Sequence, residues 1–200
     1  MEYEQQRADG VTTFYALDVV AWRAWLTEHH QNVKSVWLII YRKDSGTPSI
    51  TYPEAVDEAL CFGWIDSKPN KRDEDSFYQY FSKRKAKSNW SRVNKEKIAR
   101  LEKAGKLAPA GWAMVELAKS NGTWTALDAV ENLIVPPDLQ VAFEQYPGST
   151  VNWEAFPRSA KRGILEWILN AKRPETRAKR IAETARLAQQ NERANQYRKQ

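Results

Sequence analysis

Two neighbouring segments combine aromatic rings and cations in a pattern typical of ligand binding. The first is Gly63-Trp-Ile-Asp-Ser-Lys, and the second, residues 78–95, includes the cations Lys83, Arg84, Lys85, Lys87 and Arg92. Aromatic rings stack on flat groups and cations neutralise anions, as on nucleic-acid surfaces. Ser88 and Ser91 precede an expected helix, whose free amide groups form an anion-binding arrangement. These residue types indicate a binding site and leave open whether a reaction follows.

The two segments predict one pocket if the chain brings them together. Its lining residues would be Trp64, Asp66, Arg84, Ser88, Trp90 and Asn94. Asp66 would orient a donor, Arg84 would meet an anion, and the two indoles would offer stacking faces. The expected ligand is therefore small and either anionic or planar. The alternative interpretation is structural: both tryptophans pack the sheet against helices, and the cations only fringe a hairpin.

The sequence offers few residues that could perform covalent catalysis or bind a metal ion. Cys61 is the single cysteine, which excludes an internal disulfide and a cysteine-based zinc cluster. It lies near the end of an expected helix, where the dipole disfavours a thiolate, so we expect a core cysteine; a cysteine enzyme is the less favoured alternative. His29 and His30 are adjacent and do not share a helix face, which disfavours a metal site built from these two histidines. The sequence predicts no metal and no cofactor, and it leaves enzyme status uncertain.

Length and composition narrow the remaining choices. The chain has 200 residues, 42% of them hydrophobic, which is enough for a core without disulfides. Its longest apolar run, residues 36–41, is far shorter than the roughly 20 residues of a membrane span. The acidic, polar start lacks the pattern of a secretory signal, so we expect a cytoplasmic protein. No glycine-rich phosphate loop, Gly-x-Ser-x-Gly elbow or His-Glu-x-x-His helix occurs, which weakens the hydrolase, kinase and dinucleotide interpretations.

Positive charge is concentrated in two segments. Residues 68–106 carry 13 Lys and Arg against 5 Asp and Glu, and residues 161–200 carry 11 against 4, within a net charge of +6. Such polarity suits a polyanion such as nucleic acid, an acidic small ligand or an acidic protein partner. The structural alternative is that Lys and Arg only solvate exposed helix faces. On a helix, Arg173, Arg177 and Arg180 would share a face. The alternative function is therefore polyanion binding by both segments; the second contributes Lys172, Arg173, Arg177, Lys179 and Arg180.

The first half of the chain predicts a small sheet with helices. The expected elements are a helix from Asp18, a strand at residues 36–43, a further short strand, a helix from Thr51 to Gly63, and a hairpin at residues 65–68 and 76–84. Asp18 is placed to cap the first helix. Thr51 and Glu54 form a capping-box pattern at the start of the second helix, and Gly63 is placed to end that helix.

The second half predicts helices and completes an α+β fold. The expected helices run from Ser91 to about Lys103, over 110–120, from Pro136 to about Pro147, over 160–171 with Ser159 as cap, and from Pro174, while residues 124–130 are ambiguous. We expect an α+β unit over residues 1–90, with a small N-terminal sheet. A C-terminal helical module over 91–190 would pack on it, followed by a flexible polar tail at 191–200.

Two stretches carry a family resemblance. One is Glu58-Ala-Leu-Cys-Phe-Gly-Trp-Ile-Asp followed by Ser88-Asn-Trp-Ser-Arg-Val-Asn, and the other begins Ser159-Ala-Lys-Arg-Gly-Ile-Leu-Glu-Trp. Together they resemble the YdeI/OmpD-associated family, also called bacteriocin-protection proteins, over roughly residues 18–187. Ser67 stands where the family usually has Gly, and Phe81-Ser-Lys-Arg stands where it usually has Phe-Thr-Pro-Arg.

The resemblance implies a role in protection against bacteriocins or cationic antimicrobial peptides, a link to stress, and association with a porin. It implies no defined reaction. A chain with a net charge of +6 attracts cationic peptides poorly. We therefore expect a small anionic or planar ligand, with a polyanion or an acidic protein as the alternative partner.

Overall fold

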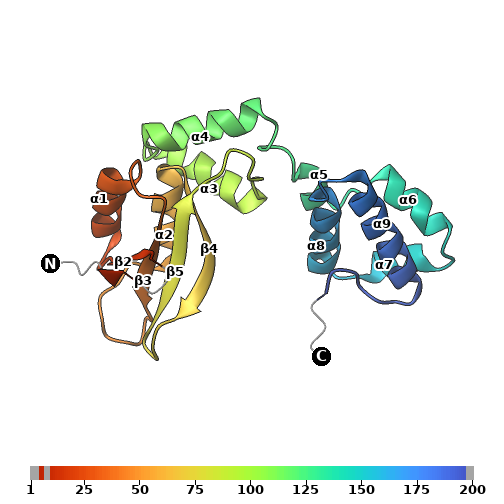
Figure 1. Cartoon of the computed structure of the whole chain (residues 1–200), viewed down its shortest axis with the longest axis horizontal. Coiled ribbons are helices and arrows are strands. Elements are labelled where there is room, and N and C mark those ends of the chain that lie inside the picture. Colours follow the sequence, from red (N-terminus) through yellow and green to blue (C-terminus); the bar gives the residue numbers. More distant parts are fainter. Residues whose placement is uncertain (1–4, 7–9, 197–200) are drawn as a thin grey trace. The chain divides into compact units, whose positions relative to one another are not determined.

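The structure is a computed structural model that describes residues 5–6 and 10–196 (Figure 1). It divides into two compact units, residues 1–125 and 126–200, and each has its own hydrophobic core. The first unit contains a sheet with helices, and residues 126–196 of the second form helices without strands, which confirms the α+β class.

The first unit is built on a five-stranded sheet with the strand order β1-β2-β3-β5-β4. The strands are β1 (Gln5–Gln6), β2 (Thr12–Tyr15), β3 (Ser35–Tyr41), β4 (Trp64–Lys71) and β5 (Ser76–Lys83). β2 and β3 are parallel, and the other pairs are antiparallel. The predicted hairpin is β4–β5. The short strand expected before the second helix does not form, because the Ile50 amide bonds to the Ala16 carbonyl, away from the sheet ladder.

Helices α1 (Val19–His29) and α2 (Tyr52–Cys61) cover one face of this sheet. Asp18 caps α1 as predicted, since its carboxylate accepts a hydrogen bond from the Ala21 amide at 2.8 Å. The predicted capping box of α2 is also present, with the Thr51 amide donating to Glu54 at 3.0 Å. Gly63 follows α2 with φ of +72°, which suits glycine and releases the chain into β4.

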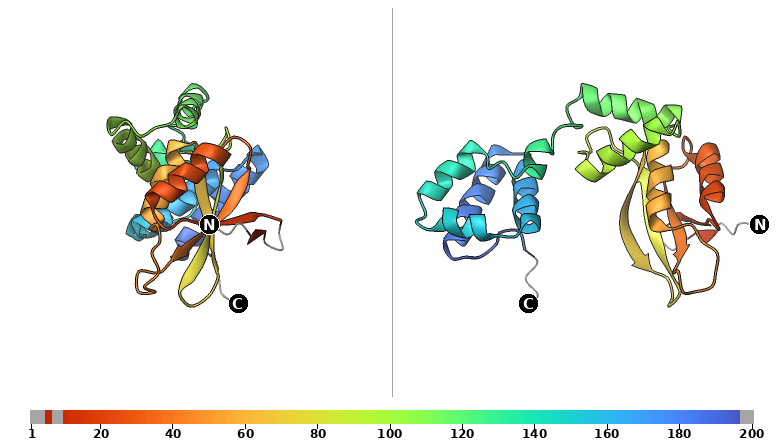
Figure 2. Two further views of the ribbon diagram at one scale, coloured as in Figure 1. Left: turned by 90° about the vertical axis from the view of Figure 1, so that its left-hand side faces the viewer. Right: turned by 180° about the vertical axis from the view of Figure 1, so that it is seen from behind.

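Helices α3 (Arg92–Lys103) and α4 (Pro109–Ser120) belong to the first unit as well (Figure 2). Ile98 of α3 and Val115 of α4 are buried in the core that α2 and the sheet share. Gly111 lets α4 approach the end of α2, because an added Cβ would lie 2.2 Å from the Cys61 carbonyl oxygen. The first unit therefore ends after Thr125, and the boundary expected near residue 90 differs because these packing contacts are long-range.

The second unit contains five described helices around a core that includes Trp153 and Ile164. They are α5 (Asp128–Glu131), α6 (Pro137–Glu144), α7 (Ser149–Ala155), α8 (Arg158–Leu169) and α9 (Pro174–Gln189). The expectation that Ser159 caps a helix is wrong, because α8 begins two residues before the expected start and Pro157 is its N-cap. Of the expected tail, residues 191–196 follow α9, and 197–200 lie outside the described residues. Among the described helices, none has the length and apolar character that crossing a membrane demands.

Candidate functional site

Arg84 directly follows β5 and lies beside the turn between α2 and β4. Its backbone amide donates to the Gly63 carbonyl at 3.0 Å, which fixes the chain at this point. The side chain is only 5% exposed, although arginine is rarely so deeply buried without a partner.

The guanidinium of Arg84 is packed against a ring and only partly hydrogen-bonded. Its central carbon lies 3.7 Å from the centre of the Trp90 ring, a close cation–π contact. Nη2 donates to the Asn89 carbonyl. Nε and Nη1 are buried and have no hydrogen-bond partner among the described residues. Because buried N–H groups are nearly always paired, these two donors require an explanation.

The charge of Arg84 is retained despite its burial. Burial lowers the pKa of the guanidinium to about 10, and the nearby Asp66 carboxylate opposes that change. A pKa of about 10 leaves the group protonated at neutral pH. Among the described residues, no carboxylate forms an ion pair with Arg84, so the chain surrounds a cation that it does not neutralise by contact.

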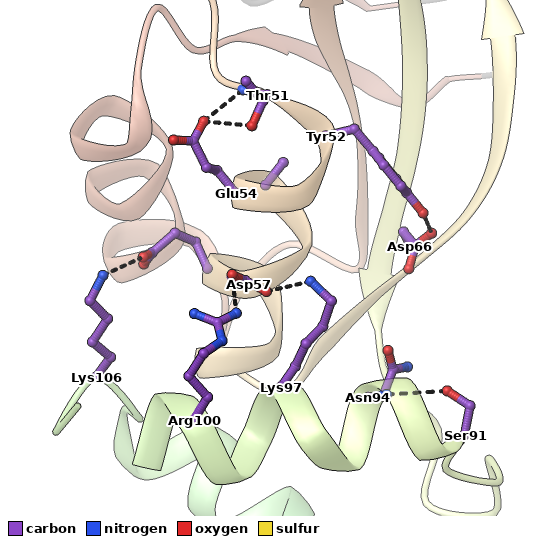
Figure 3. A network of polar contacts seen from close by, with 12 residues as sticks. Thr51, Tyr52, Glu54, Asp57, Asp66, Ser91, Asn94, Lys97, Arg100 and Lys106 are labelled. Atoms are coloured by element: carbon purple, nitrogen blue, oxygen red, sulfur yellow. Dashed lines mark hydrogen bonds and ion pairs between the residues drawn. The ribbon is translucent and has the colours of Figure 1, made fainter. Parts of the chain in front are cut away.

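A group of polar side chains lies between α2, β4 and α3 (Figure 3). The Tyr52 hydroxyl donates to Asp66 at 2.6 Å. Burial and the Asp66 contact raise the pKa of Tyr52 to about 12. Farther along α3, Lys97 lies 2.5 Å from the Asp57 carboxylate. The side chain of Asn94 points from the first turn of α3 towards the strands.

The structure brings only part of the predicted pocket together. Arg84 and Trp90 are in contact, and Asp66 is close enough to influence the charge of Arg84. Ser88 and Asn94 are half-buried on either side of Ser91, which caps α3 by accepting from the Asn94 amide at 3.3 Å.

Trp64 differs from its expected role. Its side chain is 1% exposed, and its indole N–H donates to the His30 carbonyl at 3.3 Å. It packs edge-on against Trp25, with ring centres 5.8 Å apart. Trp64 therefore has no open face on which a ligand could stack. Trp90 is also 1% exposed, and it packs against Trp124 in addition to Arg84.

Two residues of this region were not singled out by the sequence. The position of Tyr52 was predictable from the sequence, because it directly follows the capping residue Thr51 and therefore lies in the first turn of α2. Gln79 lies opposite Leu38 on the helix-covered face of the sheet, and its buried side-chain nitrogen has no partner among the described residues. Nothing in the sequence marks Gln79 as unusual, because its burial follows from strand register alone.

Cys61 is a core cysteine, as predicted. Its side chain is fully buried, and burial, together with the neighbouring Glu58 carboxylate, raises the pKa of the thiol to about 11. Glu58 is itself buried and paired with Arg23 at 2.5 Å. This environment disfavours a thiolate nucleophile.

The second basic segment is partly occupied by internal contacts. Arg177 forms a two-pronged ion pair with Asp138, at 2.7 and 3.0 Å. Arg180 donates to the Trp167 carbonyl, and its guanidinium carbon lies 4.8 Å from the centre of the Trp167 ring. These two arginines therefore join α9 to neighbouring helices. Of the cations proposed for polyanion binding, Lys172, Arg173 and Lys179 are exposed.

Two family models match different parts of the chain. Residues 132–191 match the family described as "Bacteriocin-protection, YdeI or OmpD-Associated", which confirms the predicted resemblance in the second unit. Residues 14–114, which contain Arg84 and Trp90, match a "Domain of unknown function (DUF8412)". No curated protein and no solved structure shows significant similarity to the chain. Because the second match spans just over half of the 200 residues, the chain belongs to the DUF8412 family, and it carries a YdeI/OmpD-associated domain at residues 132–191.

Proposed function

We propose that the first unit binds a small anionic ligand at the Arg84 guanidinium. One observation carries the proposal: a protonated, buried guanidinium keeps two N–H-bearing nitrogens without a partner. An unpaired buried charge is costly, and such groups concentrate at functional sites. An anion would supply both the missing hydrogen bonds and the missing opposite charge.

The donor pattern favours an oxyanion. Nη2 has two N–H groups, of which the Asn89 carbonyl takes one. The other lies beside an unpartnered nitrogen, and such a pair of parallel N–H groups matches two oxygens of a carboxylate or a phosphate. The Trp90 ring already occupies one face of the guanidinium, so the anionic rather than the planar character of the ligand is decisive.

Entry of the ligand requires a local movement. Nε and Nη1 are not open to solvent, and the groups that touch the guanidinium, Asn89 and Trp90, end the segment that follows Arg84. In this proposal the segment 85–89 moves outward to admit the anion. Lys85 and Lys87, both exposed on that segment, would attract an anion towards the opening.

The test is a thermal-shift screen with phosphate, sulfate, succinate and a nucleoside monophosphate at constant ionic strength. A ligand that binds only the folded state raises the melting temperature, and the increase grows with the logarithm of its concentration relative to its Kd. We expect at least one oxyanion to stabilise the native protein and to have no effect on Arg84→Met. Arg42→Met, which removes an exposed arginine, should respond like the native protein. Equal shifts in native protein and Arg84→Met would contradict the proposal.

The description of the family matched by residues 132–191 supports a cellular role in bacteriocin protection. We propose that anion binding in the cytoplasm contributes to resistance to cationic antimicrobial peptides or to stress; the free thiol of Cys61 is compatible with a reducing compartment. A strain that lacks the gene should be more sensitive to such peptides. The native gene should restore resistance, whereas Arg84→Met should not. Full complementation by Arg84→Met would show that anion binding at Arg84 does not contribute to resistance.

A further inference from the structure

β3 and β5 present an aromatic face on the side of the sheet opposite α1 and α2. Leu38 and its alternate neighbours on β3 point into the core that these helices cover. The intervening residues of a strand point to the other face. Register places Trp37 opposite Tyr80 and Ile39 opposite Tyr78, so all four lie on this second face.

The tyrosines form the outer layer of this aromatic face. Trp37 is 2% exposed, and the ring centres of Tyr80 and Tyr78 lie 4.8 and 6.1 Å from it in edge-to-face contacts. Tyr15 and Tyr41 form a second edge-to-face pair at 5.4 Å. All four tyrosines are half-buried, so none of them is enclosed as fully as Trp37.

Two cations lie close to these rings. The Lys68 ammonium lies 5.9 Å from the centre of the Trp37 ring, and the Arg72 guanidinium carbon lies 5.5 Å from that of Tyr41. β4 has one carboxylate, Asp66, and its register opposite the buried Phe81 directs it to the helix-covered face. β2, β3 and β5 contain no acidic residue. Arg72 also pairs with an aspartate of the hairpin turn, so the charge of Lys68 is the more available.

We propose that this aromatic face binds single-stranded nucleic acid. Bases would stack on the tyrosine rings, and phosphates would lie near Lys68 and Arg72, since alternating rings and cations match alternating bases and phosphates. A double helix keeps its bases stacked inside and offers no ring faces to a flat sheet. The aromatic face does not include Arg84, so this inference is independent of the small-anion site.

The test is fluorescence anisotropy with a fluorescein-labelled 15-nucleotide oligothymidylate and the corresponding oligouridylate. We expect saturable binding at 50 mM KCl that weakens strongly at 200 mM KCl. Tyr78→Ala should weaken binding about tenfold or more, whereas Tyr78→Phe keeps a ring and should stay within about twofold of the native protein. Circular dichroism and melting curves establish that each variant is folded.

The charge contribution has its own matched control. Lys119 lies 5.9 Å from the Trp124 ring, the same ring distance as for Lys68, but away from the sheet. Lys68→Ala should reduce the salt dependence by about 0.7 in the slope of log affinity against log salt, and Lys119→Ala should not. The proposal is overturned by absence of binding at 50 mM KCl, by equal binding of Tyr78→Ala and native protein, or by equal competition from a duplex of the same length. Arg84→Met should bind the oligonucleotides normally, which separates this site from the small-anion site.

Discussion

Replacing Arg84 by methionine should remove ligand binding and leave the first unit almost as stable as before. Methionine keeps much of the length of arginine and its contact with the Trp90 ring, but it removes the buried charge. If the guanidinium is present for binding, its loss should cost little stability.

The magnitude follows from the environment of Arg84. Burial lowers its pKa from the ordinary arginine value to about 10, and at about 1.4 kcal/mol per pKa unit the charged form is disfavoured by about 3 kcal/mol. The hydrogen bond to the Asn89 carbonyl contributes about 1.5–3 kcal/mol, and the Trp90 contact contributes about 2 kcal/mol. A methionine sulfur on the same ring recovers about 1 kcal/mol. The net change in the free energy of unfolding should therefore lie within about 1 kcal/mol.

Urea unfolding followed by tryptophan fluorescence measures this change directly. Seven of the nine tryptophans precede residue 126, so the signal reports mainly on the first unit. Arg84→Met should shift the free energy of unfolding by less than about 1 kcal/mol in the absence of oxyanions. A loss of more than about 3 kcal/mol would show that the guanidinium has a net structural role, and it would refute the reasoning.

Three further predictions address packing, thiol reactivity and pH. Gly111→Ala should lower the free energy of unfolding by about 1–3 kcal/mol in urea denaturation, because its Cβ would overlap the Cys61 carbonyl. Gly163→Ala, with open space around an added Cβ, should instead raise it by up to about 1 kcal/mol, and the opposite order would contradict the packing argument. The Cys61 thiol, with a pKa of about 11, should react slowly with a disulfide reagent at pH 8 until urea unfolds the protein; labelling of the native protein within seconds would disprove its burial. Burial alone would raise the pKa of Asp57, but two cations of α3 lower it, so its carboxylate stabilises the fold above about pH 4 and loses that effect as pH falls. Asp57→Asn should therefore flatten the loss of stability below pH 4, and an unchanged acid profile would count against the ion pairs.

Local sequence signals predicted most of the fold. Asp18 and Ser91 cap their helices as expected, and the capping box at Thr51 begins α2, because these interactions involve only residues three positions apart. β2 and α7 were missed, since four and seven residues carry too little periodicity to be distinguished from loops. The division after Thr125 depends on the packing of α3 and α4 on the sheet core, which local sequence signals do not report.

The sequence indicated which types of residue the candidate site contains, but it did not indicate which of their side chains are buried. The sequence indicated Arg84 and Trp90 as lining residues of one pocket, and the structure brings them into contact. It also suggested Trp64 as an open stacking face, but strand alternation and the Trp25 contact enclose that ring. Two unpartnered nitrogens on Arg84 could not be foreseen, since the partners of a buried side chain depend on three-dimensional packing.

The most direct test of the central claim is an NMR titration of the arginine Nε–H groups in ¹⁵N-labelled protein. The Arg84 signal is identified by its absence in Arg84→Met, and an oxyanion from the thermal-shift screen is then added at constant ionic strength. We predict a saturable shift of the Arg84 signal and little change in that of Arg177, which is already paired with Asp138. An Arg84 signal that stays unchanged while the oxyanion stabilises the protein would contradict the account.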